Sequence, residues 1–332
     1  MPKIAIAQFA PVFNDKQGAL DRCCEIIDMA GAAGADVIAF PESWLGGYPA
    51  WCFGAADWST GTGDEIYAEF LRSSFVVGDG SGDGDLAPVA MAARTHGITV
   101  VIGLNERAEP ASGTVFNAMV TIGGAGQLLN HHRKLNPTYT EKNVWAPGDA
   151  AGLRVVETAA GRIGGLVCWE HWNPLARQVL HAGSEQIHVA AWPDLSEMHQ
   201  IASRSYAFEG RCFVVVAANI IAAHDLPDAY VEPFRHGLDA SWESGDGYLF
   251  NGGSGVIDPW GQWVCGPAWD GEKLVVADMA TDAIEESQYK SDIAGHYQRA
   301  DLFRLQVRSE RTAVHGVEYS CADRGDRWTA GG

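Results

Sequence analysis

The sequence lacks long apolar runs, although 47% of its 332 residues are hydrophobic. No stretch reaches the roughly 18 consecutive apolar residues of a membrane-spanning helix, so we expect no membrane contact. Residues 1–13 (MPKIAIAQFAPVF) carry one lysine and an alternating apolar pattern, which favours a first strand over a secretory signal. An N-glycosylation acceptor is also absent, because a proline blocks the N-x-Thr match at Asn136.

Basic residues are few: 23 Lys and Arg stand against 42 Asp and Glu, which gives a formal net charge of −19. Such an excess of acid repels phosphate backbones and anionic lipids, so we expect neither nucleic acid nor membrane as a partner. The seven cysteines are odd in number and irregularly spaced, which does not fit a disulfide framework. These features together predict a cytoplasmic protein.

Motifs for common cofactors and for serine nucleophiles are missing as well. Residues 78–85 (GDGSGDGD) are rich in glycine but lack G-x-G-x-x-G spacing, and residues 252–255 (GGSG) do not match G-x-S-x-G. Cys168 and His171 have C-x-x-H spacing, but no second pair with zinc-ligand spacing accompanies them. We therefore expect no metal and no organic cofactor.

Apolar runs typical of strands alternate with segments of helical periodicity, and this alternation predicts an α/β fold with helix layers outside mixed sheets. Predicted strands cover residues 3–9, 35–42, 97–106, 114–122, 126–134, 161–168, 184–193 and 211–219. Predicted helices cover residues 18–33, 64–75, 86–96, 173–182 and 196–210, residues 46–63 form a predicted loop, and residues 252–265 and 272–279 are hairpin-like. We expect one domain over residues 1–284 and a polar tail over 285–332.

Three reactive residues stand at the ends of predicted strands. Glu42 ends VIAFPE, Lys134 ends LLNHHRK and Cys168 ends RIGGLVC. Because sites in open α/β sheets gather at strand ends, these side chains can meet in space. Taken singly, each also fits an ordinary role: a solvated loop carboxylate, a surface lysine and an inert core thiol.

The chemistry of these residues is coherent. A cysteine attacks as its thiolate, and a nearby cation lowers the pKa of the thiol. A poorly solvated glutamate such as Glu42 can take the thiol proton. The ammonium of Lys134 and the backbone N–H of Trp169, the residue after the cysteine, can stabilise negative charge on the substrate atom under attack.

The segments around these residues resemble the nitrilase superfamily, in order and over about residues 3–305. They are FPESWLGGYP (40–49), HRKLNPTYTEKNVWAPGD (132–149) and CWEHWNP (168–174), followed by AAWPD (190–194), RSYAFEGRCFVVVAAN (204–219), GGSGVIDPWG (252–261) and GHYQRADLF (295–303). The Cys-Trp-Glu-His run is similar to the true nitrilase branch, whereas amidase and carbamoylase branches usually carry other residues there. Ala300 departs from the pattern, because the family tail usually has proline at that place.

The resemblance implies a role for each matched residue. Glu42 corresponds to the general base, Lys134 to the catalytic lysine, Cys168 to the nucleophile and Glu141 to a glutamate that positions the lysine. It implies an α-β-β-α sandwich that continues across a homodimer as αββα-αββα, with a larger spiral or filament as a further possibility. It also implies hydrolysis of a small organic nitrile to acid and ammonia through a thioimidate and a thioester on Cys168, with some amide by-product.

Aromatic residues near the strand ends are predicted to line the substrate pocket, which would suit an apolar or aryl substrate. The candidates are Tyr48, Trp51, Phe53, Trp192 and His296. Core or interface packing is the alternative for each of them. For the whole chain, the alternatives are an amidase, a relative that hydrolyses cyanide, or a non-catalytic assembly protein that retains the fold.

Overall fold

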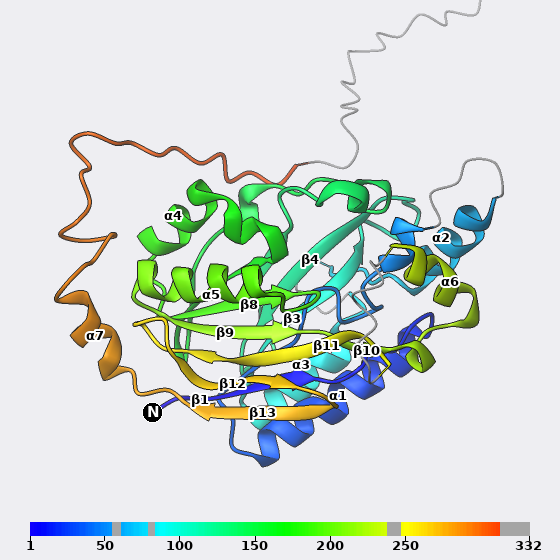
Figure 1. The fold of residues 1–332 in the computed structure, drawn as a ribbon, viewed down its shortest axis with the longest axis horizontal. Helices are drawn as coiled ribbons and strands as arrows, with labels where there is room; N and C mark the ends of the chain where they lie inside the picture. The colour runs from blue at the N-terminus through cyan, green and yellow to red at the C-terminus, as the bar shows by residue number, and fades with distance from the viewer. Residues whose placement is uncertain (55–60, 79–83, 238–246, 313–332) are drawn as a thin grey trace, which may run out of the picture.

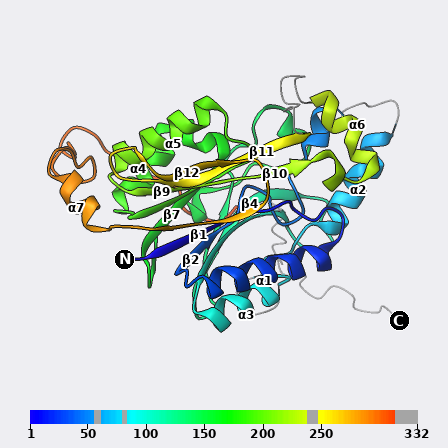
Figure 2. The ribbon, with the colours of Figure 1, turned by 60° about the horizontal axis from the view of Figure 1, so that its bottom comes forward.

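Two β-sheets lie face to face, and helices cover the outer face of each sheet (Figure 1 and Figure 2). The structure is a computed structural model and describes residues 1–54, 61–78, 84–237 and 247–312. Figure 2 shows the layers in order, with α1 and α3 beneath one sheet and α4 and α5 above the other. The predicted α-β-β-α sandwich is therefore confirmed, whereas its continuation across a dimer stays a prediction.

The first sheet has the strand order β13-β1-β2-β3-β4-β5. Its strands are β1 (Lys3–Gln8), β2 (Val37–Ala39), β3 (Thr99–Arg107), β4 (Val115–Ile122), β5 (Leu128–Arg133) and β13 (Lys273–Asp278). Strands β1, β2 and β3 run parallel, whereas β3, β4 and β5 are antiparallel neighbours. Two helices pack on the outside, α1 (Lys16–Ala32) and α3 (Ala87–His96).

The second sheet has the order β10-β11-β9-β8-β7-β6, and β12 pairs with β11. Its strands are β6 (Val156–Thr158), β7 (Gly161–Val167), β8 (Ile187–Trp192), β9 (Phe213–Ala218), β10 (Ile220–Ala222), β11 (Tyr248–Ile257) and β12 (Trp263–Trp269). Strands β7, β8 and β9 run parallel. Helices α4 (Pro174–Ala182) and α5 (Glu197–Gly210) cover it.

Shorter elements gather near one end of the sandwich, where α2 (Thr62–Ser73) and α6 (Asp228–Gly237) lie side by side (Figure 1 and Figure 2). The 3₁₀ turns are η1 (Ala50–Phe53), η2 (Tyr139–Asn143), η3 (Ala150–Gly152), η4 (Cys168–Trp172) and η5 (Ala223–Asp225). Helix α7 (Asp282–Gln288) crosses the expected domain boundary, and residues 289–312 contain no helix or strand. The rest of the predicted tail lies outside the described residues.

The alternation of side chains in β1 shows how the layers form. Ile4 and Ile6 face the space between the sheets, whereas Ala5 and Ala7 pack with the helix layer, as the period of two in a strand requires. Asp15 caps the start of helix α1, because its side chain accepts a hydrogen bond from the Gly18 N–H at 2.9 Å. Both faces of the strand are thus buried, which is why its sequence is almost wholly apolar.

Two expectations about the elements were wrong. Strands β11 and β12 do form a hairpin, but β13 leaves them and pairs antiparallel with β1 in the other sheet. The predicted loop over residues 46–63 contains the turn η1 and the start of α2. Apolar alternation identifies a strand but carries no information about its partner, so a run near a hairpin is easily assigned to it.

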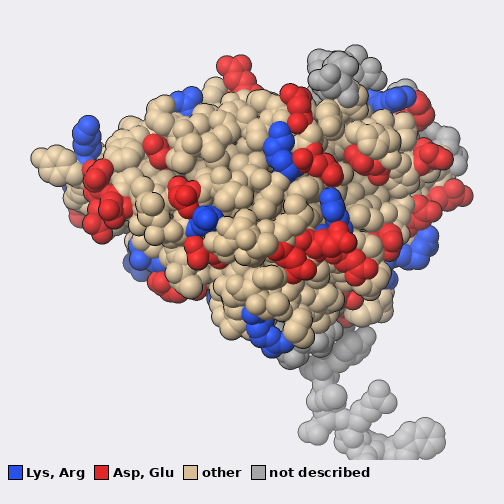
Figure 3. Space-filling view, turned by 90° about the horizontal axis from the view of Figure 1, so that it is seen from below, with Lys and Arg blue, Asp and Glu red and all other residues tan. Residues whose placement is uncertain are grey.

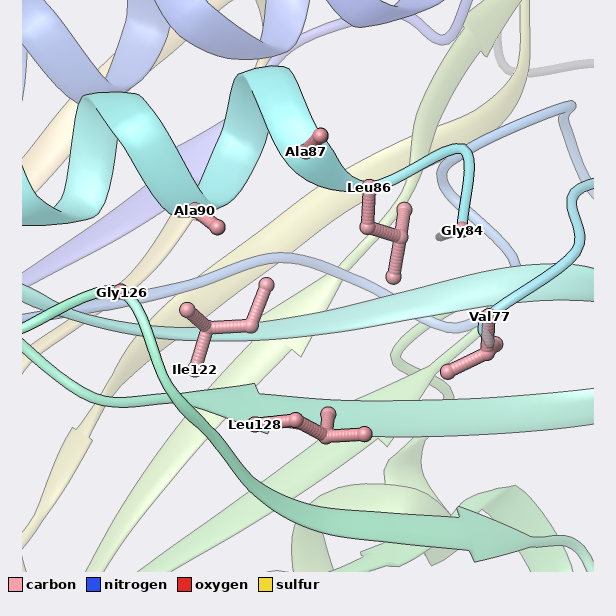
Figure 4. A pocket seen from close by; sticks show the side chains of 8 residues that line it. All are labelled: Val77, Gly84, Leu86, Ala87, Ala90, Ile122, Gly126 and Leu128. Carbon is pink, nitrogen blue, oxygen red and sulfur yellow. The ribbon is translucent and has the colours of Figure 1, made fainter. Parts of the chain in front are cut away.

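A small cavity of about 60 Å³ lies between α3 and the strands β4 and β5 (Figure 4). Its lining consists of Val77, Gly84, Leu86, Ala87, Ala90, Ile122, Gly126 and Leu128. All of these side chains are apolar or absent, and a ligand site needs a few converging polar groups. We therefore assign this cavity to the packing of the helix layer.

The surface carries the acidic character of the composition. Acidic side chains form patches on the face shown in Figure 3, and basic side chains lie between them. None of the described helices is both long and apolar enough to cross a bilayer.

Candidate active site

The three strand ends meet at the boundary between the two sheets. Lys134 follows β5 of the first sheet directly, Cys168 follows β7 of the second sheet, and Glu42 lies three residues beyond β2. The Nζ atom of Lys134 lies 2.8 Å from Glu42 Oε1 and 2.7 Å from Glu141 Oε2. One oxygen of each glutamate and the Cys168 sulfur all lie within 4.8 Å of one another. The structure thus brings together all four predicted catalytic residues, each almost fully buried.

Glu42 is fixed from both sheets. The side-chain amide of Asn117, on β4, donates to Glu42 Oε1 at 2.6 Å. Asn219, between β9 and β10, donates to the backbone oxygen of Glu42 at 2.8 Å. The other carboxylate oxygen, Oε2, is buried and has no hydrogen-bond partner among the described residues, so its lone pairs remain able to accept a proton.

The loop that carries Glu42 approaches β3 so closely that a side chain would not fit between them. A Cβ atom at Gly103 would lie 2.3 Å from the Pro41 carbonyl oxygen and 2.6 Å from the Ser43 nitrogen. Glycine at this place in β3 therefore allows the loop to bring Glu42 to Lys134.

Glu141 holds the lysine through a small network of its own. Its Oε1 accepts a hydrogen bond from the Tyr48 hydroxyl at 2.6 Å, and its Oε2 accepts one from the Thr138 N–H at 2.6 Å. The Lys134 ammonium also lies 5.7 Å from the centre of the Trp145 ring, within the range of a cation–π contact. Groups other than the ammonium therefore hold Glu141 in place, which fits its predicted role of positioning the lysine.

Cys168 has an unusual backbone conformation. Its φ is +53°, a left-handed value that costs most residues roughly 1–3 kcal/mol and that clusters at functional sites. The residue stands at the sharp turn from β7 into η4, and the next side chain, Trp169, is 55% exposed. The turn places the cysteine at the end of β7, beside Glu42 and Glu141.

A buried carboxylate ties this turn to the lysine. Glu170 accepts hydrogen bonds from the N–H groups of Val167 and Leu135, both at 2.8 Å. Val167 precedes the cysteine and Leu135 follows the lysine, so one side chain fixes both backbones. His132 also bonds to Glu170, at 2.9 Å, and together these donors outweigh burial and lower the pKa of Glu170.

Burial and charge set the protonation states of the group. Burial raises the pKa of Glu42 to about 7, although the Lys134 ammonium lowers it. Burial alone would lower the pKa of Lys134, but the neighbouring negative groups raise it well above its usual range. The resting state therefore contains an ammonium, and Glu42 changes its charge near neutral pH.

The expectation that a nearby cation lowers the pKa of the cysteine holds only in part. Burial and the Glu42 carboxylate raise the pKa of the Cys168 thiol well above its usual range, although Lys134 acts in the opposite direction. The cysteine is therefore a thiol at rest, and it needs a base at the moment of attack.

The predicted pocket residues lie in different surroundings. Tyr48 touches the site through Glu141, and Trp51 and Phe53 belong to the aromatic cluster around it. Trp192 is fully buried and stacks on rings behind the cysteine turn, and His296 is exposed in the tail beside Tyr297. Their roles in binding a substrate stay predictions.

Two carboxylates and a thiol are ligand types that metal ions accept. Here the Lys134 ammonium already bonds to both carboxylates and supplies the positive charge that a cation would bring. The donor set therefore fits a lysine-centred site better than a metal centre.

Several site residues were not found from the sequence. Asn117 and Asn219 stand in or beside strands that read as ordinary apolar runs, and Glu170 was seen only as part of the Cys-Trp-Glu-His motif. A polar amide inside a buried strand is itself a signal, because a buried polar group needs a partner. His171 was likewise seen only as part of that motif and through its spacing from the cysteine.

Comparison with known proteins agrees with the geometry. Residues 3–289 match the family described as carbon-nitrogen hydrolase. Nitrilase 2, from an unknown prokaryotic organism, is 37% identical over 326 residues, which are 97% of this chain and 98% of that protein. An aliphatic nitrilase of Sinorhizobium fredii is 33% identical over 313 residues, which are 93% of this chain and 96% of that protein.

A solved structure supports the fold. A carbon-nitrogen hydrolase from Helicobacter pylori has a TM-score of 0.65 at 18% identity, and the match covers 91% of this chain and 96% of that one. The sequence match, the shared fold and the buried group around Cys168 agree with one another, and the chain belongs to the carbon-nitrogen hydrolase family.

Proposed function

We propose that this protein is a nitrilase that hydrolyses a small organic nitrile to the carboxylic acid and ammonia. One observation supports it most directly: Lys134 bridges two buried glutamates beside the Cys168 thiol, and one oxygen of Glu42 has no partner in the described part of the chain. Such a group supplies a nucleophile, a base and a cation in one buried place. The relatives that match along their whole length are named as nitrilases.

In the proposed first step, the Cys168 sulfur bonds to the nitrile carbon while its proton passes to Glu42. One C–N π bond breaks, and the electron pair moves to the nitrogen. The Lys134 ammonium and the Trp169 N–H stabilise this developing charge. Glu42 then passes this proton to the nitrogen and becomes a carboxylate again, and the product is a thioimidate on the cysteine.

In the later steps, Glu42 activates a water that adds to the thioimidate carbon. The tetrahedral intermediate expels ammonia and leaves a thioester, which a second water hydrolyses to the acid. Two waters and one nitrile thus give one acid and one ammonia. If the intermediate expels the thiolate instead, the product is an amide, so the same site can form some amide by-product.

The aromatic cluster near Tyr48 supports an apolar or aryl substituent on the nitrile. It comprises Tyr48, Trp51 and Phe53 together with Trp145, Tyr230 and Phe250. Tyr48 both packs in this cluster and bonds to Glu141, so the substituent would lie next to the reacting group.

The decisive experiment is ammonia release from benzonitrile, phenylacetonitrile, an aliphatic dinitrile, cyanide and the matching amides. We expect release from at least one nitrile by the native protein and none by Cys168→Ala. Cys24→Ala is the matched control, because Cys24 is a half-buried residue of α1, in the opposite layer. Turnover of amides or cyanide without organic nitriles would refute the nitrilase assignment in favour of a relative in the same family.

We also propose a homodimer formed through α4 and α5, with larger spirals built from it. These helices and the turn before them expose large apolar side chains, namely Trp172, Leu175, Met198, Ile201 and Phe208. Large apolar side chains exposed on neighbouring helices are typical of a contact between proteins. Light scattering of Ile201→Glu should show a smaller species than the native protein. Met91→Glu should leave the size unchanged, because Met91 is an exposed residue of α3, in the other helix layer.

The six described cysteines form no disulfide. This supports our proposal of a cytoplasmic location, because free thiols persist in a reducing compartment.

A further inference from the structure

A chain of buried polar side chains runs away from the cysteine turn into the core of the second sheet. His171 Nδ1 lies 2.7 Å from the carbonyl oxygen of Cys168, and His171 Nε2 lies 3.0 Å from His188 Nε2. His188 Nδ1 lies 3.0 Å from Glu185 Oε2, and the Tyr206 hydroxyl donates to Glu185 Oε1. No step of the proposed reaction uses these groups, and each is at most 4% exposed.

The hydrogen positions follow from the acceptors at the two ends. The Cys168 oxygen only accepts, so His171 Nδ1 must carry a hydrogen. Neutral His171 then presents a lone pair at Nε2, and His188 must donate there. The proton between His188 Nδ1 and Glu185 can lie on either side, and in both cases His188 Nε2 remains a donor. The donor at His188 Nε2 therefore requires a proton between His188 Nδ1 and Glu185, and Glu185 is the side chain that holds it there.

The carbonyl that receives this bond belongs to the peptide that joins Cys168 to Trp169. The bond is trans, since the only cis peptide in the described residues precedes Pro267. In a trans peptide, C=O and N–H lie in one plane and point in opposite directions. His171 donates to this oxygen from the core side, where its ring stacks on Trp192 with the centroids 4.6 Å apart. The Trp169 N–H must then point away from the core.

We propose that His171, His188 and Glu185 form a positioning chain that orients the Cys168–Trp169 peptide so that its N–H faces the substrate atom that becomes negative. The inference rests on the proposed function, in which that N–H stabilises charge. The three side chains are positioning residues, since they reach the substrate only through the backbone. Without the hydrogen bond from His171 to the carbonyl oxygen, the peptide plane can rotate, and the N–H no longer points at the substrate atom.

The kinetic test compares three substitutions. His171→Phe keeps a ring on Trp192 but removes the donor. Glu185→Leu removes the group that holds the proton at His188 Nδ1. Glu185→Gln should keep the chain intact, because its amide can donate to His188 Nδ1 while its oxygen accepts from Tyr206.

Loss of an oxyanion donor costs roughly 100- to 1,000-fold in kcat, so a misaimed donor should cost roughly 10- to 100-fold. We expect that loss in His171→Phe and in Glu185→Leu, with KM close to the native value, because the charge exists only in the transition state. Glu185→Gln should retain most of kcat. Native kcat in both disrupted variants, or an equal loss in Glu185→Gln and Glu185→Leu, would overturn the proposal. A rise of KM in step with the fall of kcat would do so too, since it indicates general disruption.

A second readout does not depend on activity. The dipeptide Cys-Trp occurs once in the sequence, so carbonyl-¹³C cysteine with ¹⁵N tryptophan labels only this peptide for NMR. We expect the carbonyl resonance to move to lower frequency in Glu185→Leu and to stay in place in Glu185→Gln. If the native protein hydrolyses no nitrile and no amide, the proposed function fails. This resonance still shows whether the positioning chain holds the hydrogen bond to the Cys168 carbonyl oxygen. An unchanged resonance in Glu185→Leu refutes the inference.

Discussion

The clamp formed by Glu170 makes a sharp prediction, because one side chain fixes the backbone next to both the nucleophile and the lysine. Its two oxygens are divided between two backbone donors: Oε1 accepts from the Leu135 N–H and Oε2 from the Val167 N–H. Glutamine has nearly the same shape but only one acceptor oxygen. In Glu170→Gln, an amide NH₂ must therefore face one of the two backbone N–H groups.

The magnitude follows from that single lost acceptor. A buried N–H without a partner costs about 1–3 kcal/mol, and we expect the free energy of unfolding to fall by that amount. The unmatched group will also displace either the cysteine turn or the lysine. Since a displacement of about 1 Å can cost a factor of 10² in rate, kcat should fall roughly 10- to 100-fold.

The assay combines denaturant unfolding, followed by tryptophan fluorescence, with ammonia release from the best substrate. Glu157→Gln is the matched control, because Glu157 is exposed on the edge strand β6, and the same chemical change there should alter neither quantity. A Glu170→Gln protein with native kcat and native stability would show that the clamp has no role in positioning the site. Low pH should weaken it as well, because the lowered pKa of Glu170 means that its stabilisation is lost as the carboxylate protonates.

Three further predictions follow from the site. Because Glu42 must be ionised to act as a base and its pKa is about 7, kcat/KM should rise with pH and level off above neutrality. In Glu42→Gln, kcat/KM should fall roughly 10²- to 10⁴-fold at every pH. A flat pH profile of the native protein would contradict this role. Tyr48→Phe removes one hydrogen bond to Glu141, and a hydrogen bond to a charged group is worth about 1.5–3 kcal/mol. In steady-state assays, kcat should therefore fall roughly tenfold or more. A native kcat would show that this contact has no role in catalysis. Gly103→Ala should displace the Glu42 loop, since the new Cβ would lie 2.3 Å from the Pro41 oxygen. The melting temperature and kcat should both decrease. A variant with native melting temperature and native kcat would refute the close approach.

Much of the architecture could be predicted from the local pattern of the sequence. The runs that end at Lys134 and Cys168 are continuous and apolar, as buried strands of a covered sheet must be, and both form strands within a residue or two of the predicted ends. Helix α6 was missed because Pro233 lies inside it and interrupts the helical pattern. The partner of β13 was missed because pairing across two sheets leaves no trace in the strand itself.

The site divides in the same way. Glu42, Lys134 and Cys168 became candidates because reactive residue types stand at strand ends, and the resemblance to the nitrilase superfamily then implied their roles. Apart from Glu141, which the family resemblance implied, their supports were not identified, because contacts such as Asn219 with Glu42 span 177 positions of sequence and depend on how the two sheets face each other. A sequence therefore reveals the reacting groups more readily than the groups that orient them.

The charge balance of the site explains why a thiol with a raised pKa suits the proposed reaction. If Cys168 were already a thiolate, it would add a negative charge to a buried group that holds two carboxylates and one ammonium, at a large desolvation cost. When the thiol instead transfers its proton to Glu42 as the carbon–sulfur bond forms, the negative charge moves directly to the substrate nitrogen, where Lys134 faces it. The free thiolate need never accumulate. The pH dependence of turnover should then report the protonation of Glu42 and not that of the cysteine, which is the reverse of what an isolated reactive thiol would show.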